Sequence, residues 1–86
     1  MASVLMYCTA ACPFCQSAER LLAEKDVRDM EIIRVDLQPA RRAEMTQKSG
    51  RRTVPQIWIG ERHVGGCDDL YALEREGKLD SLLKAS

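Results

Sequence analysis

Two cysteines three positions apart form the pattern in this sequence that most directly indicates chemistry. Cys12 and Cys15 enclose Pro13 and Phe14, with an apolar run before them and a helix-like run after them. Backbone N–H groups in the first turn of a helix have no partners within the helix, so a helix start stabilises an anion. A thiolate is such an anion, and it is the nucleophile of disulfide exchange. The pattern therefore predicts thiol redox chemistry.

The two thiols are expected to take different roles. Pro13 suits the first helical position, because it lacks a donor that the helix would not use. We therefore expect Cys12 to lie exposed at the mouth of the helix and to be the attacking thiol. Cys15 lies almost one turn further in, where it either resolves a mixed disulfide or stays sheltered.

The first half of the chain predicts a strand, a helix and a second strand around this pair. Short apolar runs indicate strands over residues 3–7 and 31–35, and residues 13–25 have an amphipathic helical pattern. Together they make a βαβ unit with parallel strands. A second helix is expected over residues 39–49, with Ala43 and Met45 pointing inward.

The second half predicts a hairpin and a third helix. The two runs 56–59 and 62–64 flank Gly60-Glu61, which favours a type II′ turn between antiparallel strands. A helix capped by Cys67 or Asp68 follows, and a last short helical turn is expected near the C-terminus. The order β-α-β-α-β-β-α, combined with the redox motif, predicts an α/β fold: a four-stranded mixed sheet flanked by helices, the thioredoxin fold.

Size and composition limit the classes of function. The 86 residues predict one domain over residues 1–86, and 13 basic residues balance 13 acidic ones, so neither nucleic acid nor a membrane is an expected partner. The start has no basic or long apolar segment typical of a signal peptide, so we expect a reducing, cytoplasmic location. A zinc site would need His63 and Cys67 as a second ligand pair at an unusual spacing, so no metal is expected.

Two further stretches indicate a ligand site. Pro55 follows Thr53 and Val54 just before a strand, where it is either a plain strand-entry proline or a cis-proline that turns backbone groups toward a ligand. The segment Gly65-Gly66-Cys67-Asp68-Asp69 combines glycines, which allow close approach, with a helix start. Such a segment suits a zwitterionic amino-acid end, with N–H groups for its carboxylate and an aspartate for its ammonium.

Three blocks together resemble the glutaredoxin family, in particular its short dithiol members from bacteria. They are CPFC at residues 12–15, SGRRTVPQI at residues 49–57 and GGCDDL at residues 65–70. The likeness extends over residues 4–83, with the blocks at the spacing of the family. It implies a glutathione-dependent thiol–disulfide oxidoreductase that reduces protein–glutathione mixed disulfides and protein disulfides.

The resemblance also implies a glutathione site. Cys12 matches the nucleophile of the family and Cys15 its second cysteine, while Phe14 stands where tyrosine is usual beside the glutathione sulfur. The implied glutathione-binding residues are Phe14, Arg42, Arg52, Thr53, Val54, Pro55, Gly66, Cys67, Asp68 and Asp69.

Each part of glutathione has an implied partner in this set. The backbone of residues 53–54 would pair with the cysteinyl part, ahead of the cis-proline. Residues 66–68 would receive the γ-glutamyl end, assisted by Asp69, and Arg42 or Arg52 would pair with the glycyl carboxylate.

One position departs from the family pattern. The family usually has a lysine three residues before the first cysteine, and this chain has Thr9. Without that cation we expect less thiolate at Cys12, or weaker binding of glutathione, than in a lysine-bearing relative.

Other potentially reactive side chains have simpler interpretations. Cys8 ends the first strand and is expected to act as a small buried hydrophobe, with a regulatory disulfide as the alternative. Cys67 opens a helix, which favours reactivity more. His63 is expected to be a solvated or edge residue of the hairpin, and Trp58 and Tyr71 are expected in the core.

Two alternative functions remain open. A general disulfide reductase of thioredoxin type would need no γ-glutamyl pocket, so the segment at residues 65–69 argues against it. A [2Fe–2S] carrier would hold its cluster with Cys12 thiolates of two subunits and two glutathiones, and Pro13 stiffens the loop against that assembly. For the glutathione-dependent enzyme we expect a monomer.

Overall fold

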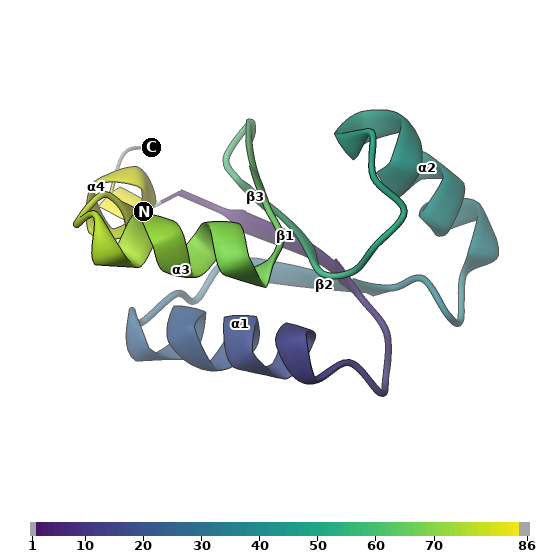
Figure 1. Ribbon diagram of the computed structural model, residues 1–86, viewed down its shortest axis with the longest axis horizontal. Coiled ribbons are helices and arrows are strands. Elements are labelled where there is room, and N and C mark those ends of the chain that lie inside the picture. The colour runs from purple at the N-terminus through teal and green to yellow at the C-terminus, as the bar shows by residue number, and fades with distance from the viewer. Residues whose placement is uncertain (1, 85–86) are drawn as a thin grey trace.

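A computed structural model describes residues 2–84, in which strands and helices alternate as the sequence patterns predict (Figure 1). The elements are β1 (Val4–Cys8), α1 (Pro13–Glu24), β2 (Met30–Arg34), α2 (Pro39–Ser49), β3 (Gln56–Ile59), β4 (Arg62–Gly65), α3 (Cys67–Arg75) and α4 (Leu79–Lys84). The residue ranges predicted for these strands and helices differ from the observed ones by no more than one residue at either end, because helix ends and strand ends have weaker patterns than their centres.

The four strands form one mixed sheet in the order β2-β1-β3-β4. The pair β1 and β2 is parallel, as the βαβ prediction requires, and β3 is antiparallel to both β1 and β4. Gly60 has a φ of 60° in the β3–β4 turn, while Glu61 keeps a negative φ, which is the pattern of the predicted type II′ turn. The fold is the predicted thioredoxin fold.

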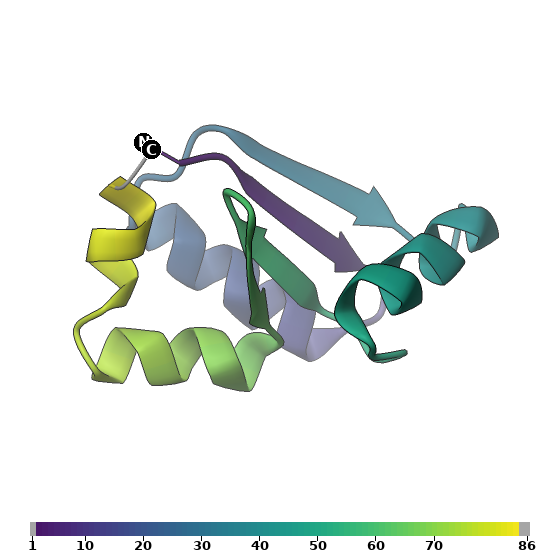
Figure 2. The same ribbon diagram turned by 90° about the horizontal axis from the view of Figure 1, so that it is seen from above.

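Helices cover both faces of the sheet (Figure 2). Successive residues of a strand point to opposite faces, so Val4, Met6 and Cys8 pack on the side of α1, α3 and α4, whereas Tyr7 packs on the side of α2. The larger core lies on the first side and includes Leu22, which is fully buried. Burial of one such side chain contributes about 1.5–3 kcal/mol.

The helix α2 is held differently from the others. Met45 is its one fully buried residue, and Ala43 is exposed, so the inward orientation predicted for Ala43 is wrong. The helix lies by the carboxyl ends of β1 and β2, where it covers only part of the sheet (Figure 2). Polar contacts add to this packing: the Tyr7 hydroxyl donates to Glu44, and the Lys48 ammonium lies 4.7 Å from the Trp58 ring centre.

Among the described residues, the helices are all too short and too polar to span a bilayer.

Candidate active site

The loop between β1 and α1 places Cys12 at the start of α1. Cys12 is the N-cap residue, Pro13 takes the first helical position, and the Cys12 Sγ accepts the Cys15 backbone N–H at 3.2 Å. The same sulfur lies 3.8 Å from the carbonyl oxygen of Val54, to which the thiol donates. Because the loop before β3 covers it in this way, Cys12 is only 8% exposed. The prediction of an exposed Cys12 is therefore wrong, although its place at the helix start is confirmed.

Cys15 is the more sheltered of the two thiols, being 3% exposed on the inner side of α1. Burial raises the pKa of the Cys15 thiol well above its ordinary value, and the contact with Cys12 raises it further. Cys15 therefore stays protonated at neutral pH, as its predicted shelter suggests.

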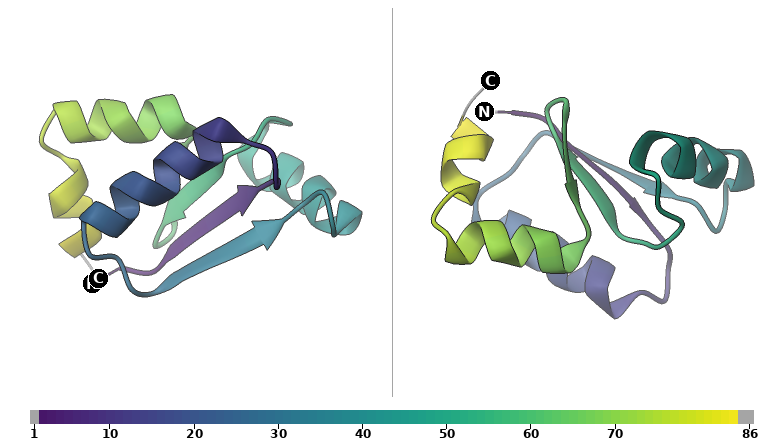
Figure 3. Two further views of the ribbon diagram at one scale, coloured as in Figure 1. Left: turned by 90° about the horizontal axis from the view of Figure 1, so that it is seen from below. Right: turned by 45° about the horizontal axis from the view of Figure 1, so that its top comes forward.

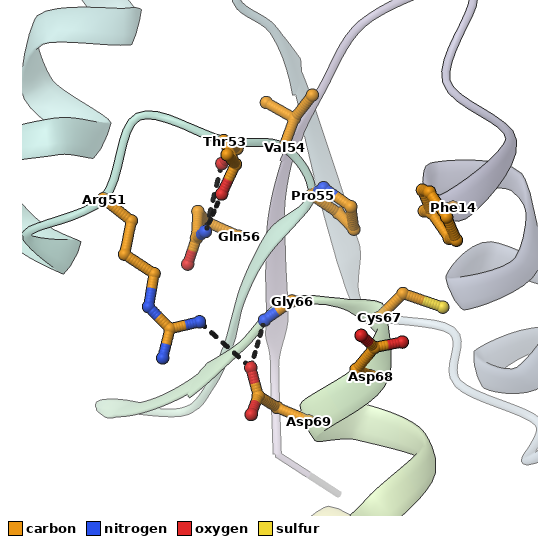
Figure 4. A pocket seen from close by; sticks show the side chains of 10 residues that line it. All are labelled: Phe14, Arg51, Thr53, Val54, Pro55, Gln56, Gly66, Cys67, Asp68 and Asp69. Atoms are coloured by element: carbon orange, nitrogen blue, oxygen red, sulfur yellow. Dashed lines mark hydrogen bonds and ion pairs between the residues drawn. The ribbon is translucent and has the colours of Figure 1, made fainter.

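A groove of about 200 Å³ lies beside Cys12, between the start of α1, the loop before β3 and the start of α3 (Figure 4). Its lining residues are Phe14, Arg51, Thr53, Val54, Pro55, Gln56, Gly66, Cys67, Asp68 and Asp69. The structure thus brings together three sequence blocks that lie far apart in the chain.

The loop before β3 is fixed by internal contacts. The Val54–Pro55 peptide bond is cis, so a plain trans strand-entry proline is excluded. The Gln56 side-chain N–H donates to the Thr53 carbonyl oxygen at 3.0 Å, and its side-chain oxygen lies 2.8 Å from the His63 Nε2.

These contacts also decide between the two positions expected for His63, that of a solvated residue and that of an edge residue. This residue lies on the edge strand β4, as expected, but it is half-buried and its ring centre lies 4.6 Å from that of Trp58. Its Nε2 is hydrogen-bonded to the buried Gln56 side chain, which needs a polar partner, so this ring nitrogen does not face solvent. Trp58 itself is buried as predicted.

The start of α3 forms the opposite wall of the groove. The helix begins at Cys67, and Gly66 is its N-cap, so the caps predicted at Cys67 or Asp68 are wrong. Instead, the Asp69 Oδ2 reaches back and accepts the Gly66 N–H at 2.9 Å. Gly65 has a φ of 118°, and a Cβ atom there would overlap the Asp69 carboxylate. Glycine at this position therefore leaves the space in which Asp69 caps the helix.

Arg51 completes this wall. Its Nη1 donates to the Asp69 Oδ2 at 3.0 Å, and both side chains point toward one another at the edge of the groove (Figure 4). The Gly66 N–H and then the Arg51 guanidinium hold the pKa of the Asp69 carboxyl below its usual range. Neither Arg51 nor Gln56 was among the predicted site residues. Their signal was their place in the block at residues 49–57.

The two predicted arginines lie elsewhere. Arg42 and Arg52 line a second hollow, of about 600 Å³, beside α2. The Arg42 Nη1 donates to the Arg52 carbonyl oxygen at 3.1 Å, which joins the helix to the loop.

The remaining thiols are buried. Cys8 and Thr9 line a third hollow, of about 350 Å³, together with Cys15. Burial raises the pKa of the Cys8 thiol and of the Cys67 thiol. Cys8 thus has the buried position predicted for it, and Cys67 opens α3 as expected. Within residues 2–84 no group of three His, Cys, Asp or Glu side chains is arranged to hold a metal ion.

Both helix starts next to the groove offer electrostatic stabilisation to an anion. The first backbone N–H groups of α1 and α3 lie beside it, and each helix dipole has its positive end there. A groove of this kind suits a ligand with a thiolate or disulfide sulfur near Cys12 and a carboxylate near α3.

Known proteins resemble this chain in sequence and in fold. A family model described as Glutaredoxin matches residues 4–64. A glutaredoxin of Pseudomonas aeruginosa is 59% identical over 85 residues, which are 99% of this chain and 100% of the relative. The solution structure of a glutaredoxin from Brucella melitensis has a TM-score of 0.85 and 56% identity, covering 98% of this chain and 90% of that one. The crystal structure of a buckwheat glutaredoxin–glutathione complex has a TM-score of 0.87 and 30% identity, and the match covers 95% of this chain and 76% of the buckwheat chain. The chain therefore belongs to the glutaredoxin family of thiol–disulfide oxidoreductases.

Proposed function

We propose that this protein uses glutathione to reduce protein–glutathione mixed disulfides and protein disulfides. The observation that carries the proposal is the groove beside Cys12, in which the cis-Pro55 loop and the start of α3 face a common space. The buckwheat relative binds glutathione with the same fold. The proposed location is the cytoplasm, because the reaction needs a pool of reduced glutathione.

In the proposed complex each part of glutathione meets a different wall. The cysteinyl part pairs with the backbone of Val54, beside the Cys12 sulfur and the exposed Phe14 ring. The γ-glutamyl carboxylate takes N–H groups at the start of α3, and the Asp68 carboxylate takes the ammonium. Arg51 adds positive charge at this end of the groove.

The other end of glutathione keeps the partners proposed from the sequence. Arg42 or Arg52 would take the glycyl carboxylate from the hollow beside α2. Because Arg42 already donates to the Arg52 carbonyl oxygen, its remaining N–H groups are the ones available.

The proposed reaction begins with the Cys12 thiolate. It attacks the glutathione sulfur of a protein–glutathione mixed disulfide, the protein thiolate leaves and takes a proton, and glutathione stays on Cys12. A second glutathione thiolate then attacks the glutathione sulfur, forming glutathione disulfide and restoring Cys12. Each step exchanges one disulfide for another, so the net change converts one mixed disulfide and one free glutathione into a free protein thiol and glutathione disulfide.

Protein disulfides would use both cysteines. Cys12 forms a mixed disulfide with the substrate, and Cys15 then attacks the Cys12 sulfur, releasing the second substrate thiol and leaving a Cys12–Cys15 disulfide. Because burial raises the pKa of the Cys15 thiol, Cys15 has to lose its proton before it attacks, and its proximity to the Cys12 sulfur favours this step.

The test follows reduction of a small glutathione mixed disulfide, with glutathione, glutathione reductase and NADPH. The wild type is expected to turn over, Cys15→Ser is expected to keep this activity and lose reduction of protein disulfides, and Cys12→Ser is expected to lose both. Residual turnover in Cys12→Ser would contradict the proposal. Two further measurements test the alternative functions. Turnover with thioredoxin reductase in place of glutathione and glutathione reductase would indicate a thioredoxin-type enzyme. Visible absorbance after anaerobic purification would indicate a [2Fe–2S] carrier.

A further inference from the structure

All four thiols share the apolar cluster behind the groove, and three of them, Cys8, Cys12 and Cys15, come from the end of β1 and the start of α1. The alternation of β1 points Cys8 to the same side of the sheet as Met6, where α1 packs. Cys12 and Cys15 belong to this cluster as well. Figure 3 shows α1 starting beside the carboxyl end of β1, so a short loop separates Cys8 from the redox pair.

Cys8 and Cys15 also border one open space. Both line the hollow of about 350 Å³ between the end of β1, the start of α1 and β2. Cys12 faces the other way, toward the Val54 carbonyl oxygen. The Thr9 backbone, next to Cys8, offsets part of the rise in the pKa of Cys15, which places Thr9 close to this thiol. The hollow thus leaves room for the sulfurs of Cys8 and Cys15 to approach each other by side-chain rotation.

We propose that Cys8 is a third redox thiol, which exchanges with the Cys12–Cys15 disulfide to form a Cys8–Cys15 disulfide. The inference rests on the proposed function for that starting disulfide. In the exchange, Cys8 loses its proton to solvent and its thiolate attacks the Cys15 sulfur. The Cys8–Cys15 bond forms, the Cys12–Cys15 bond breaks, and Cys12 leaves as a thiolate. Cys8 is oxidised and Cys12 is reduced, so no further oxidant is needed.

The exchange would change which reactions the protein performs. With Cys15 bound to Cys8, Cys12 is free and can still take glutathione from a mixed disulfide, whereas the resolving thiol is blocked. The oxidised protein would then act through one cysteine until glutathione reduces the Cys8–Cys15 bond.

The environment of Cys8 sets the pH dependence of this step. Burial raises the pKa of the Cys8 thiol, the charges of Glu19 and Asp36 raise it further, and Arg34 lowers it. In the reduced protein a Cys12 thiolate raises it as well, but this contribution is absent once Cys12 is in the disulfide. Exchange therefore depends on a small ionised fraction at neutral pH, and its rate is expected to rise by about tenfold per pH unit below that pKa.

The experiment determines which thiol stays free after oxidation. The purified protein is oxidised with one equivalent of diamide, incubated, treated with iodoacetamide, reduced, and labelled with N-ethylmaleimide. Trypsin places the three cysteines in the peptide of residues 1–20 and Cys67 in that of residues 63–75, and fragmentation of the first peptide locates each label. Iodoacetamide on Cys8 reports the Cys12–Cys15 disulfide, whereas iodoacetamide on Cys12 alone reports the Cys8–Cys15 disulfide.

We expect iodoacetamide on Cys8 in samples blocked early. In samples blocked after longer incubation we expect part of the iodoacetamide on Cys12 instead, and this change is expected to be faster at higher pH. Cys8→Ala is expected to keep Cys12 and Cys15 in their disulfide throughout, and Cys8→Ser is a second variant with the same expected result. If the wild type carries iodoacetamide on Cys8 at every time and pH, the exchange is refuted while the proposed function is not. If the Cys12–Cys15 disulfide never forms, the proposed dithiol function fails first.

Discussion

Removing the carboxylate of Asp69 is expected to loosen the start of α3. In Asp69→Ala the Gly66 N–H loses its acceptor, which costs about 1 kcal/mol for loss of a helix cap. The ion pair with Arg51 is lost as well, and since the two side chains are 50% and 44% exposed, solvent screening limits it to about 0.5 kcal/mol. We therefore expect the free energy of unfolding to fall by about 1–2 kcal/mol.

Two further variants separate these contributions. Asp69→Asn keeps an oxygen for the Gly66 N–H and loses only the charge, so it is expected to cost about 0.5 kcal/mol. Arg51→Gln removes the same ion pair from the other side and is the matched control, with the same expected cost. The double variant is expected to cost less than the sum, because either change alone already breaks the pair.

The loss should also depend on pH in a defined direction. The carboxyl pKa is lower in the folded state than in the unfolded chain, so the charged form stabilises the fold. That contribution is fully present above the unfolded pKa of about 3.9 and is lost as pH falls through the lower folded pKa. The difference between wild type and Asp69→Asn is therefore expected at pH 7 and should disappear in acid.

Urea unfolding followed by the fluorescence of Trp58, the single tryptophan, measures these free energies. Glutathione kinetics form a second measurement, in which Asp69→Ala is expected to raise the KM for glutathione more than it lowers kcat. Equal decreases in the free energy of unfolding for Asp69→Asn and Asp69→Ala would refute the assigned capping role, because the carboxylate would then contribute only its charge. A free energy of unfolding that is unchanged in Asp69→Ala would refute it as well.

Three other changes have expected outcomes. Gly65→Ala should lower stability by about 2–3 kcal/mol and raise the KM for glutathione, because the new Cβ displaces Asp69 at a positive φ; an unchanged urea midpoint would contradict this. Met45→Ala should cost about 2–5 kcal/mol in thermal or urea unfolding, since Met45 is the one fully buried residue of α2. Thr9→Lys should speed alkylation of Cys12 at neutral pH by roughly threefold to tenfold, because a nearby cation favours the thiolate; an unchanged rate would show that the missing lysine has no such effect here.

The fold could be predicted from the sequence because its signals are local. Apolar runs, the Gly60 turn and the proline-led helices each depend on neighbouring residues, and the mixed sheet follows from their order. The periodicity of a helix does not indicate how much of the helix lies over the sheet. Ala43 has the spacing of an inward residue, yet α2 covers only part of the sheet, so the residue is exposed.

The site was predicted less evenly, for a related reason. The backbone positions at residues 53–55 and 66–67 are set by glycine and proline, and all of these residues line the groove. The direction of a long side chain depends on which acceptor it reaches in three dimensions. Arg51 reaches Asp69, whereas Arg42 reaches the Arg52 carbonyl oxygen, and no local pattern distinguishes these outcomes.

The groove is built largely from main-chain groups, and this explains which residues carry the sequence signal. Pro13 starts the helix that presents an N–H group to Cys12, the Val54 carbonyl oxygen next to Pro55 accepts from the same sulfur, and Gly65 leaves room for the cap of α3. None of these three residues needs to touch a ligand through a polar side chain. Because backbone geometry depends most strongly on proline and glycine, a site made of N–H and C=O groups is recorded in the sequence by those residues. Thr9, in place of the usual lysine, changes a charged side chain near the redox pair without changing any of these proline and glycine positions.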